Sequence, residues 1–302
     1  MTIAIEDVIQ KIDAWRGKQI NIKALSGGLT NQNFRLDVDG QPYFVSIPGI
    51  ATELLAVDRA SEYHNTNAAA ATGIGPRVLY HLPELNVMVL EFIRGTTMSI
   101  EVMAAAEMPG RLAQTLRTLH AGPRFFNDFN MFRLTEFYLH IVEKHNFPIP
   151  DDYRSRMSAV RRIETATHKK TLASVPCSND LVAENIIDDG RMLRLVDFEY
   201  SGNNDPCFEL GSAGCELQYN HDQFAELCRA YFGQMRRHLL ARMHLYSLMA
   251  DFGWTLWGAI QSKISKLDID FRAYTIGRWE HALGMLDSDD FPRWLADAGR
   301  ED

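Results

Sequence analysis

The stretch CSNDLVAENIIDDGRMLRLVDFEY, residues 177–200, is the part of this 302-residue sequence that most narrows the fold. Two short apolar runs flank the turn signal Asp189-Gly190, and this pattern predicts a β-hairpin. Asn185 enters the first strand and Asp197 leaves the second, so pairing across the turn brings both to the open end of the hairpin. The sequence therefore predicts two oxygen donors side by side.

A further carboxylate, Asp180, lies just before the hairpin. Two converging oxygen donors beside a carboxylate are what a hard divalent cation and a general base require, because Mg²⁺ takes few protein ligands and keeps water or phosphate oxygens for the rest. Phosphoryl transfer needs that arrangement. Asp and Asn also form turns in many loops, so spacing alone leaves a purely structural interpretation open beside the chemical one.

The pattern of the sequence changes near Gly95, well before the hairpin. Residues 21–94 contain short alternating runs typical of an antiparallel sheet, with the turn Asp39-Gly40 between two of them. One helical pattern, residues 52–71, interrupts these strands. After Gly95 the apolar residues recur about every 3.6 positions, so we expect helices there, with the hairpin as the exception.

The length and composition fit a protein with two lobes. The sequence is 46% hydrophobic and 23% charged, which supplies enough apolar residues for a sizeable core. We expect an α+β protein with a small sheet-rich lobe, residues 1–94, and a larger helical lobe, residues 95–302. The cleft between two such lobes is a default place for a ligand.

Charge and apolar patterning argue against several partners. The sequence has 31 Lys and Arg against 39 Asp and Glu, which gives a net charge of −8. This negative charge disfavours binding to nucleic-acid backbones and to anionic membranes. No signal peptide is visible at the start, and the apolar stretch 245–260 is too short and too polar to span a bilayer. The four cysteines form no CxxC pair, which predicts reduced thiols. We therefore expect a soluble, cytoplasmic protein with no nucleic-acid partner and no membrane insertion.

With Asn179 in front of Asp180, the hairpin stretch resembles the choline and ethanolamine kinase family, of the bacterial choline kinase type, within the wider group that includes aminoglycoside phosphotransferases. The family pattern is His-Asn-Asp, then an Asn five residues after the Asp, then a strand that ends in Asp. The resemblance runs along nearly the whole chain, from the loop SGGLTNQNF at residues 26–34 to the tryptophan segment at residues 251–265. It implies a two-lobed, protein-kinase-like fold and an ATP-dependent kinase that uses Mg²⁺.

The resemblance also implies roles for individual residues. Asp180 would orient and deprotonate the substrate hydroxyl, while Asn185 and Asp197 would hold Mg²⁺ between the nucleotide phosphates. The glycine loop would approach the phosphates, Glu62 would help to organise them, and the hinge before Arg94 would meet adenine. Without this context, Gly-Gly between strands is more often a plain hairpin turn, and Glu62 can be a solvated helix acid. The implied nucleotide-binding residues are Gly27, Gly28, Thr30, Asn31, Glu62, Glu91 and Ile93.

A second group of residues would bind the acceptor. Trp254 and Trp257 are three positions apart, so their indoles are neighbours on one helix face, and such a pair can hold a quaternary ammonium by cation–π attraction. Core packing is the ordinary alternative for two tryptophans at this spacing. The segment resembles the part of choline kinases that forms the choline pocket, and Glu216 and Tyr219 resemble the acidic and aromatic residues that complete it.

Two positions depart from the family pattern. Ser46 stands where relatives carry an Arg or Lys that faces the phosphates, and Ser178 stands where the family has His before Asn-Asp. Lys23 or another basic residue could replace the missing cation. Two hypotheses follow: an active kinase for a small amino alcohol, choline first and ethanolamine, thiamine or an aminoglycoside after it, or a degenerate relative that binds a cationic ligand or nucleotide without turnover.

Overall fold

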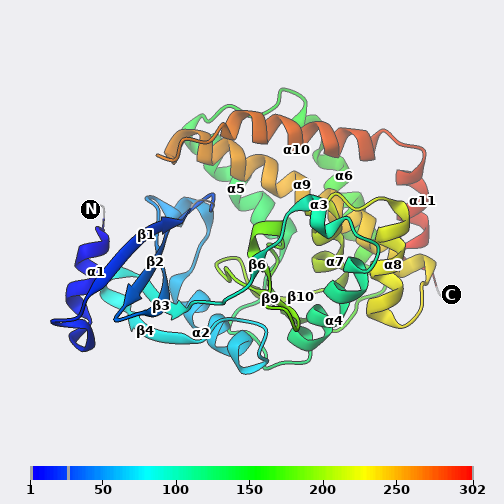
Figure 1. Ribbon diagram of the computed structural model, residues 1–302. Coiled ribbons are helices and arrows are strands. Elements are labelled where there is room, and N and C mark those ends of the chain that lie inside the picture. The colour runs from blue at the N-terminus through cyan, green and yellow to red at the C-terminus, as the bar shows by residue number, and fades with distance from the viewer. Residues whose placement is uncertain (1–2, 26–27, 301–302) are drawn as a thin grey trace.

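A computed structural model describes residues 3–25 and 28–300. Its first part is a five-stranded antiparallel sheet in the order β1-β2-β3-β5-β4, which lies on the left of Figure 1. The turn at Asp39 and Gly40 has positive φ at both residues, 50° and 82°, as a two-residue hairpin turn requires. The strands are β1 (Ile20–Leu25), β2 (Gln32–Val38), β3 (Gln41–Ile47), β4 (Val78–Leu82) and β5 (Val87–Glu91).

One face of this sheet is covered by the N-terminal segment. Helix α1 (Ile5–Lys11) and the short helix η1 (Asp13–Trp15) pack on alternating apolar residues of β2, β3 and β5. Trp15 is buried there and contacts the rings of Tyr43 and Tyr80 edge-on, at 5.1 and 5.6 Å between centroids. The alternation predicted a half-buried sheet, and the structure confirms it.

The helical pattern over residues 52–71 forms two helices rather than one. The short helix η2 (Thr52–Leu55) ends at Ala56, which has a φ of 57°, and α2 (Arg59–Ala71) begins anew after Asp58. The Asp58 carboxylate accepts hydrogen bonds from the backbone N–H groups of Ala60 and Ser61, so the new start is capped. The expectation of a continuous helix was wrong because this N-cap outcompetes helix propagation.

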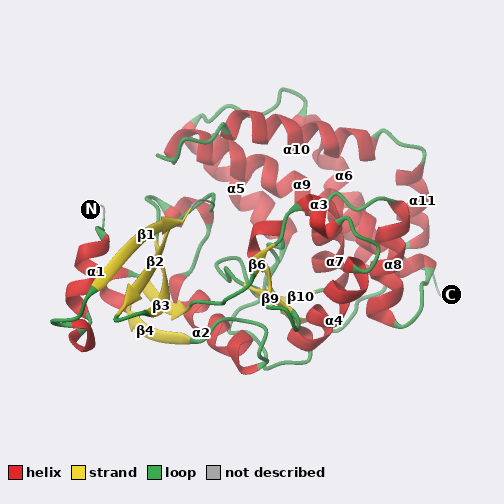
Figure 2. Ribbon diagram, in the orientation of Figure 1, coloured by secondary structure: helices red, strands yellow, loops and turns green. Residues whose placement is uncertain are grey.

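The remainder of the chain is largely helical, as expected, and Figure 2 shows the strands confined to the sheet and a small central group. Helix α9 is buried along almost its whole length and packs against α5, α7 and α10. The helices are α3 (Ile100–Met103), α4 (Met108–His120), α5 (Met131–His145), α6 (Tyr153–His168), α7 (Pro206–Glu216), α8 (His221–Phe232), α9 (Arg237–Ile264), α10 (Phe271–Leu286) and α11 (Asp290–Asp297).

The predicted hairpin is present at the centre of the molecule. Strand β8 (Ile186–Asp188) pairs antiparallel with β9 (Leu193–Leu195), and β6 (Thr96–Thr97) adds a third strand. Gly95 is required at this contact, because a Cβ there would lie 2.4 Å from the carbonyl oxygen of Asp188. A second pair, β7 (Val175–Cys177) and β10 (Gly202–Asn204), brackets the hairpin, and the short helices η3 (Pro83–Leu85) and η4 (Ala183–Asn185) complete the fold.

The sheet and the helices have separate cores. One cluster of buried apolar residues lies between α1 and the sheet, and the larger cluster fills the helical part. Leu55, Ala69 and Ile74 belong to the larger cluster although they precede the hinge in sequence. Of the helices in the described part of the chain, none is long and apolar enough to cross a membrane.

Candidate active site

The open end of the β8–β9 hairpin brings together Asp180, Asn185 and Asp197. The amide nitrogen of Asn185 donates to the Asp180 carbonyl at 3.1 Å and reaches its carboxylate at 3.5 Å. The backbone N–H of Val196 donates to the Asn185 carbonyl at 2.9 Å, which fixes the spacing across the two strands. All three side chains line one cavity of about 250 Å³. The predicted convergence of these residues therefore agrees with the geometry.

The electrostatics of this cavity disfavour negative charge when no cation is bound. Burial, followed by the charges of Glu216 and Glu199, raises the pKa of Asp180 to about 7. Burial, followed by Glu199 and Glu62, raises the pKa of Asp197 well above its usual range. A divalent cation would relieve this repulsion, and a carboxylate with an amide oxygen is a suitable donor set for Mg²⁺. The residues present therefore fit that ion.

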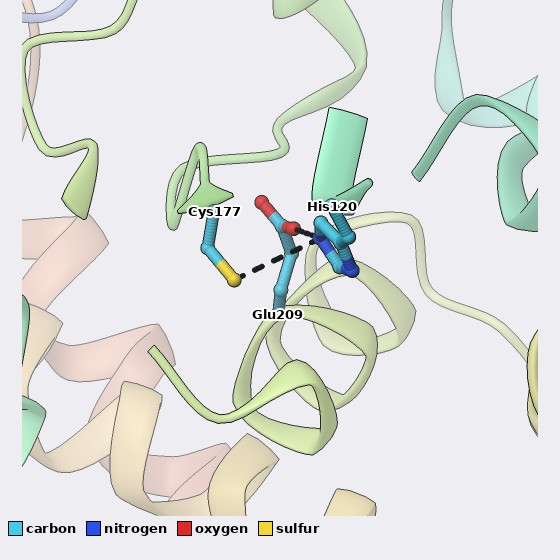
Figure 3. A group of neighbouring side chains, drawn as sticks. All are labelled: His120, Cys177 and Glu209. Atoms are coloured by element: carbon cyan, nitrogen blue, oxygen red, sulfur yellow. Dashed lines mark hydrogen bonds and ion pairs between the residues drawn. The ribbon is translucent and has the colours of Figure 1, made fainter. Parts of the chain in front are cut away.

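The loop that carries Asp180 is held by a buried carboxylate that the sequence analysis missed. Glu209, on α7, accepts hydrogen bonds from the backbone N–H groups of Ser178 and Asn179 at 2.5 and 3.1 Å. It also pairs with His120, whose Nε2 lies 3.7 Å from the Cys177 sulfur (Figure 3). The only signal in the sequence was an acid inside an apolar helical run.

The contacts of Glu209 hold the loop at Ser178, one of the two positions where the sequence departs from the family pattern. The family pattern has a His at this position, and this chain has Ser178 instead. The Ser178 hydroxyl is buried and has no hydrogen-bond partner among the described residues, so it does not hold the loop. The backbone is instead fixed through Glu209, and the side-chain amide of Asn179 donates to the Tyr200 carbonyl at 3.1 Å.

Most of the predicted nucleotide-binding residues line a second cavity, of about 360 Å³, beside the sheet. Phe44, Leu90, Phe92 and Ile93 supply apolar walls of the kind that a flat base can occupy. Asn185 and Asp197 line both cavities, so the two spaces meet at the hairpin. The predicted residues that line this cavity are Gly28, Glu62, Glu91 and Ile93, and Ser46 lines it as well.

Two of the other three predicted nucleotide residues, Thr30 and Asn31, lie elsewhere. Thr30 lines the cavity that contains Asp180. Asn31 is buried, and its amide nitrogen donates to the Glu199 carboxylate at 3.0 Å. Gly27 lies outside the described residues. The glycine loop therefore contacts the segment after Asp197 as well as the nucleotide cavity.

Arg59 is a buried cation that the sequence analysis missed, and it pairs with Glu62 although it is not among the described residues that line the nucleotide cavity. Its guanidinium lies 2.7 Å from the Glu62 carboxylate and 3.3 Å from that of Glu199. Lys23, which we considered as a substitute for the missing cation, is exposed on β1. The spacing Arg59-x-x-Glu62 on one helix was the signal that could have identified the pair.

The two predicted tryptophans lie in the cavity of Asp180. Their rings meet edge-to-face at 6.3 Å, and each side chain is 4% exposed. Trp257 donates from its indole nitrogen to the Tyr200 hydroxyl at 2.7 Å and contacts the Tyr274 ring at 5.5 Å. The burial agrees with core packing, and the position of both rings on the cavity wall is compatible with the predicted ligand-binding role, which stays a prediction. Tyr200 and Tyr274, which the sequence analysis did not single out, complete this aromatic wall.

Glu216 and Tyr219 are not part of that wall. They line a larger neighbouring cavity of about 840 Å³, which shares Tyr274 with the smaller one. Glu216 is ion-paired with Arg278, whose guanidinium also lies 3.3 Å from the buried Asp251. The negative charge that we expected to face a cationic acceptor is therefore matched by an internal arginine.

The fold and the site together define a protein-kinase-like phosphotransferase: a sheet with a helix carboxylate, a hinge, and a loop that carries Asp180 beside two metal-ligand candidates. The sequence profile described as Choline/ethanolamine kinase matches residues 22–229. The chain belongs to the choline/ethanolamine kinase family and is a small-molecule kinase.

Individual relatives agree with this family. Protein LicA of Haemophilus influenzae is 25% identical over 86% of this chain and 78% of its own length. Human ethanolamine kinase 2 is 24% identical over 88% of this chain and 76% of its own. A solved choline/ethanolamine kinase family protein from Mesorhizobium loti superposes with a TM-score of 0.84 and 34% identity, covering 96% of both chains. An aminoglycoside 2′-phosphotransferase in complex with GDP shares the fold at a TM-score of 0.65 and 13% identity, covering 96% of this chain and 98% of its own.

Proposed function

We propose that this protein transfers the γ-phosphoryl group of ATP to the hydroxyl of choline, giving phosphocholine and ADP. The observation that carries this proposal is the single cavity that contains both Asp180 and the paired indoles of Trp254 and Trp257. This arrangement supports the proposal because Asp180 would accept a proton while aromatic faces attract a quaternary ammonium. In Streptococcus pneumoniae, LicA is named a choline kinase, which supports the same acceptor.

In the proposed mechanism Asp180 accepts the proton of the acceptor hydroxyl. The hydroxyl oxygen of the acceptor bonds to the γ-phosphorus of ATP, and the bond between the γ-phosphorus and the oxygen that bridges it to the β-phosphate breaks, which releases ADP. Asn185 and Asp197 would hold Mg²⁺, which neutralises phosphate charge when bound. Trp254, Trp257 and Tyr274 exclude water around the acceptor and orient its hydroxyl toward Asp180. The pKa of Asp180, raised to about 7, suits a base that operates near neutral pH.

The proposal assigns nucleotide binding mainly to residues 1–94 and acceptor binding to residues 95–302. It also places the enzyme in the cytoplasm, where ATP is available and where the four cysteines, all unpaired in the structure, stay reduced. Ethanolamine is the second candidate acceptor, since the matching profile covers kinases of both alcohols. The pairing of Glu216 with Arg278 supports an acceptor held by aromatic faces more than by a carboxylate.

The test is ADP release by the purified protein with ATP and Mg²⁺, measured separately with choline, ethanolamine, thiamine and kanamycin. We expect the highest kcat/KM with choline and a loss of at least about 100-fold in Asp180→Asn. Trp257→Leu should raise the KM for choline about 3- to 30-fold, the range of a cation–π contact. Trp279→Leu is a matched control, because Trp279 is equally buried and also hydrogen-bonded but lies outside both cavities.

Choline turnover that is unchanged in Asp180→Asn would contradict the proposed base. Turnover with kanamycin and with no other acceptor would support phosphotransferase activity but contradict choline as the acceptor. Folded protein that binds nucleotide or choline without releasing ADP would identify a non-catalytic member of the family.

A further inference from the structure

The phosphate end of the nucleotide cavity lacks the cation that the family resemblance implies. Ser46 stands at that position on β3 and lines the cavity together with Glu62 and Asp197. No Lys or Arg is found among the described residues that line it. A triphosphate brought into this space would meet two carboxylates and no side-chain cation, an arrangement that costs binding energy.

Arg59 directly contacts one of these two carboxylates, that of Glu62. It lies in the first turn of α2, three residues before Glu62, and its side chain is 14% exposed. Its Nη1 atom contacts Glu62 at 2.7 Å and Glu199 at 3.3 Å, and the second of these carboxylates is only 3% exposed. Ion pairs this buried are screened far less by salt and water than surface pairs.

The same guanidinium connects three segments that form the site. Nη2 donates to the side-chain oxygen of Asn31 at 3.2 Å, and Asn31 in turn donates to Glu199 at 3.0 Å. Asn31 follows the glycine loop, Glu62 is on α2, and Glu199 is two residues beyond Asp197. Arg59 therefore fixes the loop over the phosphates relative to the metal-binding end of the hairpin.

Arg59 also retains unused hydrogen-bonding capacity. Its Nε atom is buried and has no acceptor among the described residues. Buried donors without partners are uncommon in folded proteins and call for a physical account. The cavity lining includes Glu62 but not Arg59, so Arg59 would act on bound phosphates through its charge and through Glu62 rather than by direct contact.

We propose that Arg59 replaces the missing strand cation, as the positioning residue that supplies positive charge to the phosphate end of the nucleotide site. In relatives the cation that pairs with the helix glutamate lies on β3, whereas Arg59 lies on the same helix as Glu62. Arg59 also holds the glycine loop through its hydrogen bond to Asn31. This inference rests on the proposed function, because it assumes that the cavity beside Ser46 accepts a nucleotide.

The experiment measures the affinity for ATP with Mg²⁺ by titration calorimetry, together with the KM for ATP and kcat, in Arg59→Met, Arg59→Lys, Ser46→Arg and the double variant Arg59→Met with Ser46→Arg. We expect Arg59→Met to weaken nucleotide affinity at least about tenfold and Arg59→Lys to weaken it less. Ser46→Arg should restore most of the affinity in the Arg59→Met background. That rescue is the decisive result, because a cation on a different element cannot repair a purely structural loss.

Arg133→Met is the matched control. Arg133 also pairs with a glutamate three residues later, Glu136, and with a distant one, Glu164, but on the exposed start of α5. We expect its nucleotide affinity to equal that of the unmodified protein.

Arg59→Met with unchanged affinity, or with a loss that Ser46→Arg does not repair, would overturn the role of Arg59 while leaving the proposed function intact. A protein that binds ATP but releases no ADP would overturn the proposed function, and the affinities alone would then decide the role of Arg59. A protein that binds no nucleotide at all would overturn both.

Discussion

Asp180 lies in surroundings that raise the pKa of its carboxyl, as the proposed role of general base near neutral pH requires. Its carboxylate lies in a cavity walled by indole and phenol rings, and the charges of Glu216 and Glu199 add to the effect of burial on its pKa. Arg278 opposes that shift, but its effect is smaller than those of burial, Glu216 and Glu199. A residue placed for stability alone would be expected to keep its charge in water or in a closer ion pair.

The pH dependence of turnover should report this shift. We expect kcat/KM to fall as the pH drops through about 7, the pKa of Asp180, because the protonated carboxyl cannot accept a proton. Glu216→Gln should move this acid limb to lower pH, since it removes a negative charge and frees Arg278. The measurement is kcat/KM from pH 5 to 9, with Glu136→Gln on the surface as control. An acid limb near pH 4 in the unmodified protein would contradict the assignment.

The same shift has a consequence for stability, with a sign that can be worked out. The pKa of Asp180 rises from 3.8 to about 7 on folding, so the folded chain binds this proton more tightly than the unfolded chain. Its contribution to the free energy of unfolding is therefore greatest at acid pH and is lost as the pH rises from about 4 to about 7. The catalytic carboxylate is thus expected to reduce stability at the pH where it works.

At the scale of elements, the packing of α7 on α9 positions the loop that carries Asp180 relative to Trp254 and Trp257. Helix α7 carries Glu209, which anchors the loop of Asp180, and α9 carries Trp254 and Trp257. The two helices approach so closely that a Cβ on Gly211 would lie 2.1 Å from the Met243 carbonyl oxygen. Only glycine permits this separation.

Gly211→Ala should therefore destabilise the protein by about 2–4 kcal/mol, because the backbone of α9 must move away from α7. Gly277→Ala, within α10, is the matched change, since a Cβ there meets no atom within 4 Å. It should raise stability by about 0.5–1 kcal/mol through helix propensity. Denaturant unfolding of the two variants measures both effects. Equal stability of the two variants would show that the helices do not meet at this distance.

The elements also show how far the sequence could predict the site. Alternating strands, the Asp39-Gly40 turn and the β8–β9 hairpin follow from local pattern and turn chemistry, and they are present as expected. The break at Ala56 was missed, because it depends on the Asp58 cap and on the hydrogen bond from Tyr138, on α5, to the Leu55 carbonyl. Since that partner lies far along the chain, no local pattern could report it.

The contacts around the proposed acceptor site could not be predicted from the sequence either, because their partners also lie far apart along the chain. The spacing of Trp254 and Trp257 predicted that their indoles share one helix face, as observed. The placement of Glu216 depends instead on its ion pair with Arg278, which lies on a different helix. The roles of Glu209 and Arg59 likewise rest on partners far away in sequence. Contacts set by a short hairpin or by spacing along one helix could be predicted, whereas side-chain pairs between elements far apart in the sequence could not.

On the scale of the whole molecule, side-chain hydrogen bonds connect the glycine loop of the sheet to the helical part of the protein at the site. The side chain of Gln261, near the end of α9, donates to the Leu29 carbonyl in the glycine loop at 2.8 Å. Asn31, two residues later, reaches Glu199 beyond the hairpin. The acceptor helix, the nucleotide loop and the metal-ligand candidates are thus directly connected, although they lie far apart in the sequence, as the colours of Figure 1 show.

The central claim is that this connected site moves a phosphoryl group onto an alcohol rather than onto water. The most direct measurement is mass-spectrometric detection of the product after the protein is incubated with ATP, Mg²⁺ and choline. We predict phosphocholine in an amount equal to the ADP released, and neither compound above background with Asp180→Asn. ADP without phosphocholine, or phosphocholine formed equally well by the Asp180→Asn variant, would contradict the account.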